Sequence, residues 1–298
     1  MSAPVELIDV TPRDGLQNEA TVLSPTARAE LVRRIIATGA RRIEAVSFVR
    51  DDLVPAMAGA EEVLAGIGPH VGVTIAGLVL NARGMQRAAD AGVDEVNFVI
   101  PATDAFAQAN QNSSVAGLMT ELGAAARVAA DAAIPLTVTI AVAFGCPFAG
   151  VVPPDAVARI AKHVTGSFGV AELALADTIG VATPWQVRET FHAVAAETTV
   201  PLRAHFHDTR RTALANVFAA LGEGVQRFDA SLAGLGGCPF APGAAGNVAM
   251  EDLAWMLDRA ELKHGISVSA ALEAGRAVAA QLGVAPRSAI AGAGPFPR

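Results

Sequence analysis

Cysteine is scarce in this sequence, with two residues among 298. Small secreted folds that depend on disulfides carry several paired cysteines, so that class of protein is excluded. The first ten residues, MSAPVELIDV, lead directly into a strand-like stretch. They contain no basic segment followed by an apolar run, which an export signal would have. We therefore expect a protein of the reducing cytoplasm.

Long hydrophobic runs and an excess of basic residues are also missing. No apolar stretch approaches the ~20 residues that a transmembrane helix needs, so we expect no membrane span. Acidic residues outnumber basic ones, and the formal net charge is −7. That balance argues against general binding to nucleic acid or to anionic membranes. It leaves room for a local basic pocket that binds an anionic metabolite.

What the sequence does contain is a regular alternation of short apolar runs and longer amphipathic stretches, with 52% hydrophobic residues overall. The eight runs predicted as strands are residues 6–11, 42–48, 71–79, 95–101, 136–144, 172–178, 202–209 and 227–234. Each is rich in Val, Ile, Leu or Phe and is too short for a helix. Several stretches between them begin with Ser/Thr-Pro and end at glycine, as at Gly39 and Gly92, which predicts helices.

Eight strands, each followed by a helix, over about 250 residues predict a (β/α)8 TIM barrel with a short C-terminal extension. We expect one domain over 1–298, with the barrel at about 5–265 and a C-terminal helix and tail at 266–298. The last residues, 283–298, are expected to be irregular. A doubly wound open sheet is the alternative. It would usually show a glycine-rich phosphate loop after its first strand, and TPRDGLQNE is not such a loop.

Polar residues gather where the predicted strands end, which is where such barrels place their reactive groups. His205 and His207 lie on one face of the seventh strand, because side chains alternate along a strand. The spacing alone leaves two interpretations open, a metal-ligand pair or two structural hydrogen-bonding groups. With Asp14 and Asn247 the pair would offer two nitrogen and two oxygen ligands. That set suits Mg²⁺ or Mn²⁺, and Zn²⁺ less well because it contains no thiolate.

Seven segments carry a further pattern: PRDGLQNE, IEAVSFV, NQNSS, FGCPFAG, ADTIGVATP, HFHDT and GLGGCPFAPGAAGNVAMEDL. In this order they resemble the motifs of the 3-hydroxy-3-methylglutaryl-CoA lyases, which belong to a superfamily of metal-dependent barrel lyases and synthases. The resemblance runs from residue 5 to about residue 290. The glycine-rich segment after the last strand separates these lyases from the related isopropylmalate and citramalate synthases.

The resemblance implies a reaction and its residues. The reaction is cleavage of a 3-hydroxyacyl-CoA into acetyl-CoA and a keto product, acetoacetate in the standard case, as in leucine degradation. The implied ligands of a divalent metal are Asp14, His205, His207 and Asn247. The implied catalytic residues are Arg13, Glu44, Cys238 and His205, and the implied substrate-binding residues are Gln17, Ser47, Asn110, Thr178 and Arg210. The relatives also suggest a homodimer.

These residue types suit a retro-Claisen cleavage, which deprotonates the C3 hydroxyl, breaks the C2–C3 bond and reprotonates the C2 enolate. Arg13 is permanently charged and is placed to stabilise charge on the thioester oxygen. Glu44 can hold Arg13 through paired hydrogen bonds, or the two can be an ordinary buried ion pair. The Cys238 thiol can move a proton if neighbouring charge lowers its pKa. The glycines expected either to let the surrounding loop close over substrate or to form a tight turn are Gly234, Gly236, Gly237 and Gly243.

Three departures from the family pattern concern the substrate region. Thr139 stands where relatives commonly carry a tyrosine, and this chain has no tyrosine at all. Arg210 and Arg211 replace the Tyr-Gly that usually follows HDT, and segment 47–57 lacks the common Pro-Lys-Trp centre. We therefore expect lyase chemistry on an analogue with a different or longer C3 substituent. The two arginines could bind a substrate carboxylate or a CoA phosphate, or could simply be solvated.

Some alternatives stay open on the sequence alone. A condensing synthase of the same superfamily is the first, and a non-catalytic acyl-CoA-binding barrel is the second. Cys146 occurs in a second GCPF segment, and we expect it to be structural or to line the substrate site rather than to form a disulfide.

Overall fold

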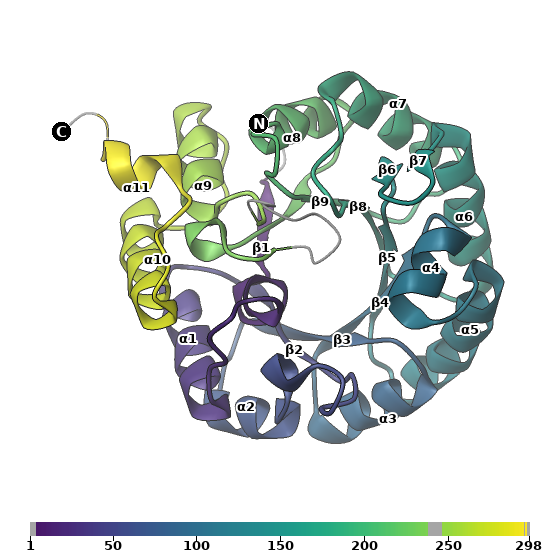
Figure 1. Ribbon diagram of the computed structural model, residues 1–298, viewed down its shortest axis with the longest axis horizontal. Coiled ribbons are helices and arrows are strands. Elements are labelled where there is room, and N and C mark those ends of the chain that lie inside the picture. The colour runs from purple at the N-terminus through teal and green to yellow at the C-terminus, as the bar shows by residue number, and fades with distance from the viewer. Residues whose placement is uncertain (1–3, 238–245, 295, 297–298) are drawn as a thin grey trace.

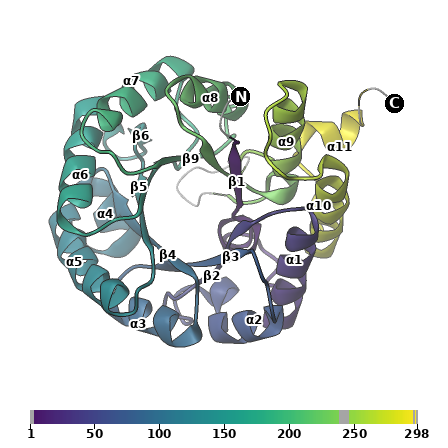
Figure 2. The ribbon, with the colours of Figure 1, turned by 180° about the vertical axis from the view of Figure 1, so that it is seen from behind.

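The computed structural model describes residues 4–237, 246–294 and 296, and its centre is a closed barrel of eight parallel strands (Figures 1 and 2). The barrel strands are β1 (Glu6–Asp9), β2 (Arg42–Ser47), β3 (Thr74–Val79), β4 (Glu95–Pro101), β5 (Leu136–Ala141), β8 (Glu172–Asp177), β9 (Leu202–Phe206) and β10 (Arg227–Ala230). Their spatial order is β1-β10-β9-β8-β5-β4-β3-β2, and β2 pairs with β1 to close the ring. The predicted TIM barrel is confirmed.

Helices surround the barrel on its outer side, as both views show. They are α1 (Pro25–Ala37), α2 (Ala60–Ile67), α3 (Ala82–Ala91), α4 (Asp104–Gln111), α5 (Val115–Asp131), α6 (Pro154–Ser167), α7 (Pro184–Ala195), α8 (Ala213–Gly222), α9 (Met250–Arg259), α10 (Val268–Leu282) and α11 (Ala289–Ala293). The last three lie together beside β1, and α10 packs against α1. Within the described ranges, no helix has both the length and the apolar character to cross a bilayer.

Alternate residues of each barrel strand face the helices or the barrel interior. In β4, Val96, Phe98 and Ile100 are fully buried in the layer between strands and helices. Glu95 and Asn97, which alternate with them along the strand, hydrogen-bond inside the barrel to side chains of β5 and β2. The interior of this barrel is therefore polar, although such interiors are usually filled by branched apolar side chains.

The polar interior residues form two layers, which we name by their position along the strands. The lower layer consists of Arg42, Glu95, Thr137, Glu172 and Arg203. The upper layer lies two residues further along β2, β4, β5 and β9 and is completed by β10; it consists of Glu44, Asn97, Thr139, His205 and Asp229. Because parallel strands all run the same way, the upper layer is the one nearer the carboxyl ends of the strands.

The barrel strands end earlier than the apolar runs predict. β9 stops at Phe206 rather than at residue 209, and β10 stops at Ala230 rather than at residue 234. His207 leaves the ladder to form an isolated bridge with Asn247, and Ser231 does the same with Ala249. The residues after each strand pair with another loop rather than with the next strand, so the periodicity of the sequence runs on past the end of the sheet.

Two smaller elements were not predicted. A short antiparallel pair, β6 (Gly145–Cys146) and β7 (Gly150–Val151), follows β5. The expectation of an irregular tail was wrong where α11 forms. Asp252 accepts hydrogen bonds from the backbone N–H groups of Ala289 and Ile290 and from the Ser288 hydroxyl, at 2.8–2.9 Å. A carboxylate that lies 36 residues or more away in the chain therefore caps this helix, and local sequence contains no sign of it.

Candidate metal centre and active site

The first part of the site is a single π-helical turn, η1 (Thr11–Gly15), which directly follows β1. The Thr11 amide donates to Asp9 Oδ1 at 2.8 Å, and the Thr11 hydroxyl accepts from the Leu232 amide at 2.8 Å. The start of the turn is therefore fixed twice, to its own strand and to the segment after β10. The turn presents Arg13 and Asp14 at the mouth of the barrel.

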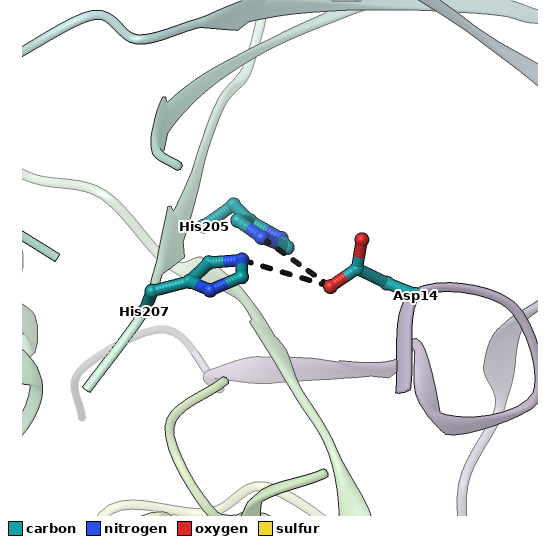
Figure 3. Close-up of side chains that lie close together, drawn as sticks. All are labelled: Asp14, His205 and His207. Carbon is teal, nitrogen blue, oxygen red and sulfur yellow. Dashed lines mark ion pairs between the residues drawn. The ribbon is translucent and has the colours of Figure 1, made fainter. Parts of the chain in front are cut away.

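At this mouth Asp14 lies close to His205 of β9 and to His207, the first residue after that strand, as Figure 3 shows. One potential ligand atom from each of the three side chains lies within 4.8 Å of the other two. Asp14 Oδ2 is 3.6 Å from His207 Nε2 and 4.0 Å from His205 Nε2. The two imidazoles lie together near Asp14 as predicted, with ring centroids 5.1 Å apart, although β9 ends before His207.

His205 is held in one orientation by a residue that the sequence analysis missed. Its Nδ1 lies 3.0 Å from Asp229 Oδ2, and both side chains are buried. Asp229 lies directly opposite His205 in the pairing of β10 with β9. A carboxylate on one ring nitrogen fixes the tautomer and leaves Nε2 free to bind a cation. The signal for Asp229 exists only once the strand register is known.

The charges around the site favour cation binding. Burial lowers the pKa of His207 to about 4, and the neighbouring His205 and Arg13 act in the same direction against Asp14, so His207 is neutral near pH 7. Burial also opposes the charge of Asp14, but Arg13 and the two histidines outweigh it and hold the pKa of Asp14 well below its usual range. For His205, the bond to Asp229 and the charge of Asp14 outweigh burial and raise the pKa. The site thus offers a charged carboxylate and a neutral imidazole.

Asn247 completes the group. Its Nδ2 donates to Asp14 Oδ2 at 2.7 Å and to the Leu235 carbonyl at 3.1 Å, while its Oδ1 is buried without a hydrogen-bond partner among the described residues. A half-turn of the carboxamide exchanges the two atoms, and an oxygen that faces Asp14 would be a ligand for a shared cation. The orphaned oxygen and the mixed carboxylate, imidazole and amide donors fit a divalent metal.

Glycine is required beside this carboxamide. Gly236 has φ +104°, and a Cβ at this position would lie 2.6 Å from Asn247 Nδ2 and 3.1 Å from the Asp14 carbonyl oxygen. Any side chain here would push the two ligand residues apart. At Gly236 the glycine-rich motif is therefore required by the close approach of Asn247 and Asp14. Cys238 and Gly243 of the same motif lie outside the described residues.

Arg13 links Asp14 of the candidate metal site to Glu44 of the upper layer. Its Nε donates to Glu44 Oε1, and its Nη1 donates to Asp14 Oδ1 at 2.7 Å. Burial disfavours the guanidinium charge, but Glu44 and Asp14 outweigh it and raise the pKa of Arg13. The predicted pairing of Arg13 with Glu44 is confirmed, and Glu44 also accepts from Asn97 Nδ2 at 2.8 Å.

A cavity of about 220 Å³ opens above these groups. Its polar lining includes Arg13, Asp14, Asn97, Thr139, His205, His207 and Asp229. Its apolar lining includes Val49, Val54, Leu78, Leu80, Val99, Phe106 and Ala141. The arrangement can therefore place a polar, anionic head on the metal side and an apolar group on the opposite wall.

The residues predicted to bind substrate divide into two groups. Gln17, Asn110 and Thr178 line the cavity, and the Thr178 hydroxyl also accepts from the Val142 amide at 2.9 Å. Ser47 is buried and is not part of the lining, and Arg210 turns away to donate to the carbonyls of Ile179 and Gly180 at 3.1 and 2.8 Å. Arg210 thus holds the loop after β8 in this structure.

Cys146 is buried outside the cavity lining. Its Sγ accepts hydrogen bonds from the Thr103 hydroxyl at 3.1 Å and from the Phe148 amide at 3.4 Å. Of the two roles that the sequence left open for it, these contacts favour the structural one.

The comparisons with known proteins agree with this geometry. A family model described as HMGL-like matches residues 4–278. The chain is 42% identical to a hydroxymethylglutaryl-CoA lyase of Pseudomonas mevalonii, over 95% of this chain and 94% of that protein. It is also 42% identical to a 3-hydroxy-3-isohexenylglutaryl-CoA/hydroxymethylglutaryl-CoA lyase of Pseudomonas aeruginosa, over 94% and 93% of the two chains.

A solved structure adds a bound ligand. The structure of an HMG-CoA lyase from Acinetobacter baumannii in complex with coenzyme A and 3-methylmalate superimposes with a TM-score of 0.94 at 35% identity, and covers 100% of this chain and 98% of that one. These matches confirm the resemblance that the motifs indicated. The chain belongs to the HMGL-like family.

Proposed function

We propose that this protein is a divalent-metal-dependent carbon–carbon lyase. Its substrate would be 3-hydroxy-3-methylglutaryl-CoA or a close 3-hydroxyacyl-CoA analogue, which it cleaves to acetyl-CoA and a keto acid, acetoacetate for the methyl compound. The observation that carries the proposal is the convergence of Asp14, His205 and His207 beside Arg13, in a cavity at the carboxyl ends of the barrel strands. The family and its relatives support the same reaction class.

The ligands would be Asp14, His205, His207 and the carboxamide oxygen of Asn247. We propose Mg²⁺ or Mn²⁺ as the resident metal, because oxygen donors with imidazole suit these ions and no thiolate lies among the described residues of the site. When bound, such an ion lowers the pKa of a substrate hydroxyl and orients the oxygens that it contacts.

The remaining steps belong to this chain's own side chains. In the cleavage, the C3 hydroxyl would give its proton to water in the cavity, the C2–C3 bond would break, and the electron pair of that bond would move onto the acetyl thioester as an enolate. Arg13 would stabilise the negative charge on the thioester oxygen, and Glu44 would hold the guanidinium in place. Cys238 would return a proton to C2. His205, whose Nδ1 is held by Asp229, would keep its Nε2 directed at the metal that orients the reacting oxygens.

We propose Gln17, Asn110 and Thr178 as contacts of the acyl-CoA, since all three line the cavity. Ser47 and Arg210 would need to change partners or position to join them, and their predicted roles depend on such a change. An assignment to leucine degradation and a homodimer follow from the resemblance and belong to the same proposal. The cytoplasmic location expected from the sequence stays a prediction.

The apolar wall of the cavity supports a substrate with a longer C3 substituent. Thr139 stands in the position of the family's tyrosine, and Leu78, Leu80 and Val99 lie around the same cavity. The Pseudomonas aeruginosa relative is named for an isohexenyl as well as a methyl compound. We expect kcat/KM for the isohexenyl thioester to exceed that for the methyl thioester. A clear preference of the purified enzyme for the methyl compound would contradict this substrate assignment.

A variant that narrows the cavity sharpens the comparison between the isohexenyl and methyl thioesters. Leu80→Trp places a large side chain at the edge of the cavity, where Leu80 is half-buried. We expect its kcat/KM to fall at least about tenfold for the isohexenyl thioester, which corresponds to about 1.4 kcal/mol, and to change little for the methyl one. Equal losses for both substrates would place the Trp against the CoA portion that they share.

The reaction itself is tested by product analysis. The protein is incubated with Mg²⁺ or Mn²⁺ and the methyl thioester, and acetyl-CoA and acetoacetate are measured together. Equal amounts of the two products, dependent on the metal, are expected. Consumption of acetyl-CoA with a 2-oxo acid would instead identify a condensing synthase, and thioester binding without turnover would identify a non-catalytic barrel.

A further inference from the structure

Arg13 stands at the end of a continuous chain of side-chain hydrogen bonds that crosses three strands. The Thr139 hydroxyl on β5 donates to Asn97 Oδ1 on β4 at 2.8 Å. Asn97 Nδ2 donates to Glu44 Oε2 on β2 at 2.8 Å, and the other oxygen of Glu44 accepts from Arg13 Nε. Arg13 then donates to Asp14 Oδ1 at 2.7 Å. The chain thus runs from the wall of the cavity to a metal ligand.

Each bond in this chain can point only one way. A guanidinium is only a donor and a carboxylate only an acceptor, so Glu44 must receive from Arg13 on one side and from an N–H on the other. Asn97 therefore has to present Nδ2 to Glu44, because the reversed amide would place two oxygens against each other. That leaves Asn97 Oδ1 facing Thr139, whose hydroxyl can donate to it.

Burial makes these orientations costly to change. Glu44, Asn97 and Thr139 are 1%, 2% and 7% exposed, so water cannot readily replace a missing partner. A carboxylate that lost the Asn97 donor in such surroundings would turn toward another donor, and the plane of the Arg13 guanidinium would turn with it.

We propose that Asn97 and Thr139 are positioning residues that fix Glu44 and, through it, the plane of Arg13. The inference rests on the role proposed above for Arg13. Neither residue needs to touch the reacting atoms for this purpose. Thr139, at the place of the family's tyrosine, would therefore do more than widen the cavity. Together with Asn97 it would preorganise Arg13, the group proposed to stabilise the thioester oxygen.

The lower layer provides a matched control for the test. Thr137 lies two residues before Thr139 on the same strand, and its hydroxyl donates to Glu95 Oε1 at 2.7 Å. Glu95 holds Arg42 and not Arg13. Removal of the Thr137 hydroxyl therefore breaks a buried hydroxyl hydrogen bond on the same strand, here to a carboxylate, without touching the chain that leads to Arg13.

The experiment compares Thr139→Val, which removes the hydroxyl at nearly constant shape, with Thr139→Ser, which keeps it, and with Thr137→Val. For Thr139→Val we expect kcat to fall about tenfold, as the loss of one buried hydrogen bond predicts. KM and the affinity for Mn²⁺, measured by titration, should stay within about twofold. Thr139→Ser should recover most of kcat, and Thr137→Val should keep it. For Asn97→Leu we expect a larger loss, about a hundredfold, because the amide bonds both neighbours.

A second measurement does not depend on turnover. In protein labelled with ¹⁵N-arginine, the Arg13 Nε–H is assigned with Arg13→Lys, and its exchange with solvent is followed without metal or substrate. We expect exchange to become at least about tenfold faster in Thr139→Val and unchanged in Thr137→Val. Unchanged exchange and unchanged kcat in Thr139→Val would overturn the inference, as would an equal loss of kcat in Thr137→Val.

The outcome separates this inference from the proposed function. If Arg13→Met is inactive while Thr139→Val and Asn97→Leu keep full kcat, positioning fails and the role of Arg13 stands. If Arg13→Met keeps full activity, the role of Arg13 fails and the inference about catalysis fails with it. A native enzyme that cleaves no thioester overturns the proposed function, and the exchange of Arg13 Nε–H still decides whether Asn97 and Thr139 position this side chain.

Discussion

The two polar layers inside the barrel share four strands, β2, β4, β5 and β9, on which their residues lie two positions apart, and the layers differ in how fully their side chains are paired. In the lower layer, Arg42 donates to Glu95 at 2.5 and 2.8 Å and to Glu172 at 2.7 and 2.9 Å. Thr137 and Arg203 supply further contacts to the same two carboxylates. The two carboxylates are thus surrounded by donors, although Arg203 Nε and Nη2 have no hydrogen-bond partner among the described residues.

The upper layer continues at the barrel mouth into Asp14 and His207, and this combined set is incompletely paired. Glu44, Asn97 and Thr139 satisfy one another, but the His205 and His207 Nε2 atoms converge on Asp14 at distances beyond a hydrogen bond. This half-open set lies at the carboxyl ends of the strands, where barrels of this type bind and react. The comparison teaches that the same kinds of side chain can serve two purposes. Where other side chains pair with them they stabilise the barrel, and where a pairing partner is missing they can bind a metal or a substrate.

The largest expected effect comes from removing His207, a proposed metal ligand that lies beside the upper layer. His207→Ala should abolish Mn²⁺ binding and lower turnover by about four powers of ten, because a bound divalent ion contributes several kcal/mol to such a transition state. Folding stability should change little or rise, since the metal-free site holds poorly paired polar groups. Mn²⁺ titration, kinetics and denaturation measure the three quantities. His192→Ala, the same substitution on an exposed histidine of α7, is the control, and metal binding retained by His207→Ala would remove that residue from the ligand set.

The second largest effect is expected for a substitution in the lower layer. Glu172→Gln keeps the shape but leaves Arg42, Arg203 and Arg227 with one carboxylate fewer. Breaking such a buried arrangement should cost about 3–5 kcal/mol in the free energy of unfolding, measured by chemical denaturation. Turnover per folded molecule should stay near that of the native enzyme. Glu121→Gln, on an exposed residue of α5, should change neither quantity. A large fall in turnover at unchanged stability would mean that this lower-layer residue serves the reaction rather than the stability of the barrel.

Two buried acids outside both layers, Glu251 and Asp9, lead to a third prediction, which concerns the pH dependence of stability. Burial raises the pKa of Glu251, on α9, to about 8 and that of Asp9, on β1, to about 7. The folded state therefore holds a proton on Glu251 that the unfolded chain releases above its ordinary pKa of about 4.5. Stability contributed by the protonated form is lost as the pH rises between these two values.

We therefore expect native protein to lose about 2 kcal/mol of stability relative to Glu251→Gln when the pH is raised from 6 to 8. Gln resembles the protonated acid and does not titrate. Denaturation of both proteins at several pH values measures the difference, with Glu189→Gln on the surface of α7 as the control. A difference that stays constant over this range would mean that Glu251 is ionised in the folded protein.

The sequence predicted those parts of the site that depend on strand ends alone. All eight barrel strands were expected at nearly their observed positions, and the barrel geometry then brings Arg13, Asp14, His205 and His207 to one mouth. Asp229 and Asn97 were missed because their roles depend on which residue lies opposite in the neighbouring strand, and the pattern of one strand does not contain that register.

The lower layer was missed for a related reason. Arg42, Glu95 and Glu172 each stand at the first residue of a strand, where a charged residue is normally interpreted as the solvated end of an apolar run. Only closure of the barrel places the three side chains within hydrogen-bond distance of one another.

Asp229 is where the two layers meet, and it gives the smallest predicted effect. Its carboxylate holds His205 Nδ1 at 3.0 Å in the upper layer and lies 3.5 Å from Arg203 of the lower layer. Asp229→Asn keeps a hydrogen-bonding group but no longer selects one tautomer of the imidazole. Mn²⁺ affinity should fall about tenfold, as expected for a residue that orients a ligand without binding the metal. Asp94→Asn removes the same kind of carboxylate from His70 at the surface, 3.2 Å away, and should leave the affinity unchanged. If Asp229→Asn instead destabilises the fold as much as Glu172→Gln does and keeps the native affinity for Mn²⁺, Asp229 belongs functionally to the lower layer. Its carboxylate would then stabilise the barrel, and its contact with His205 would not contribute to metal binding.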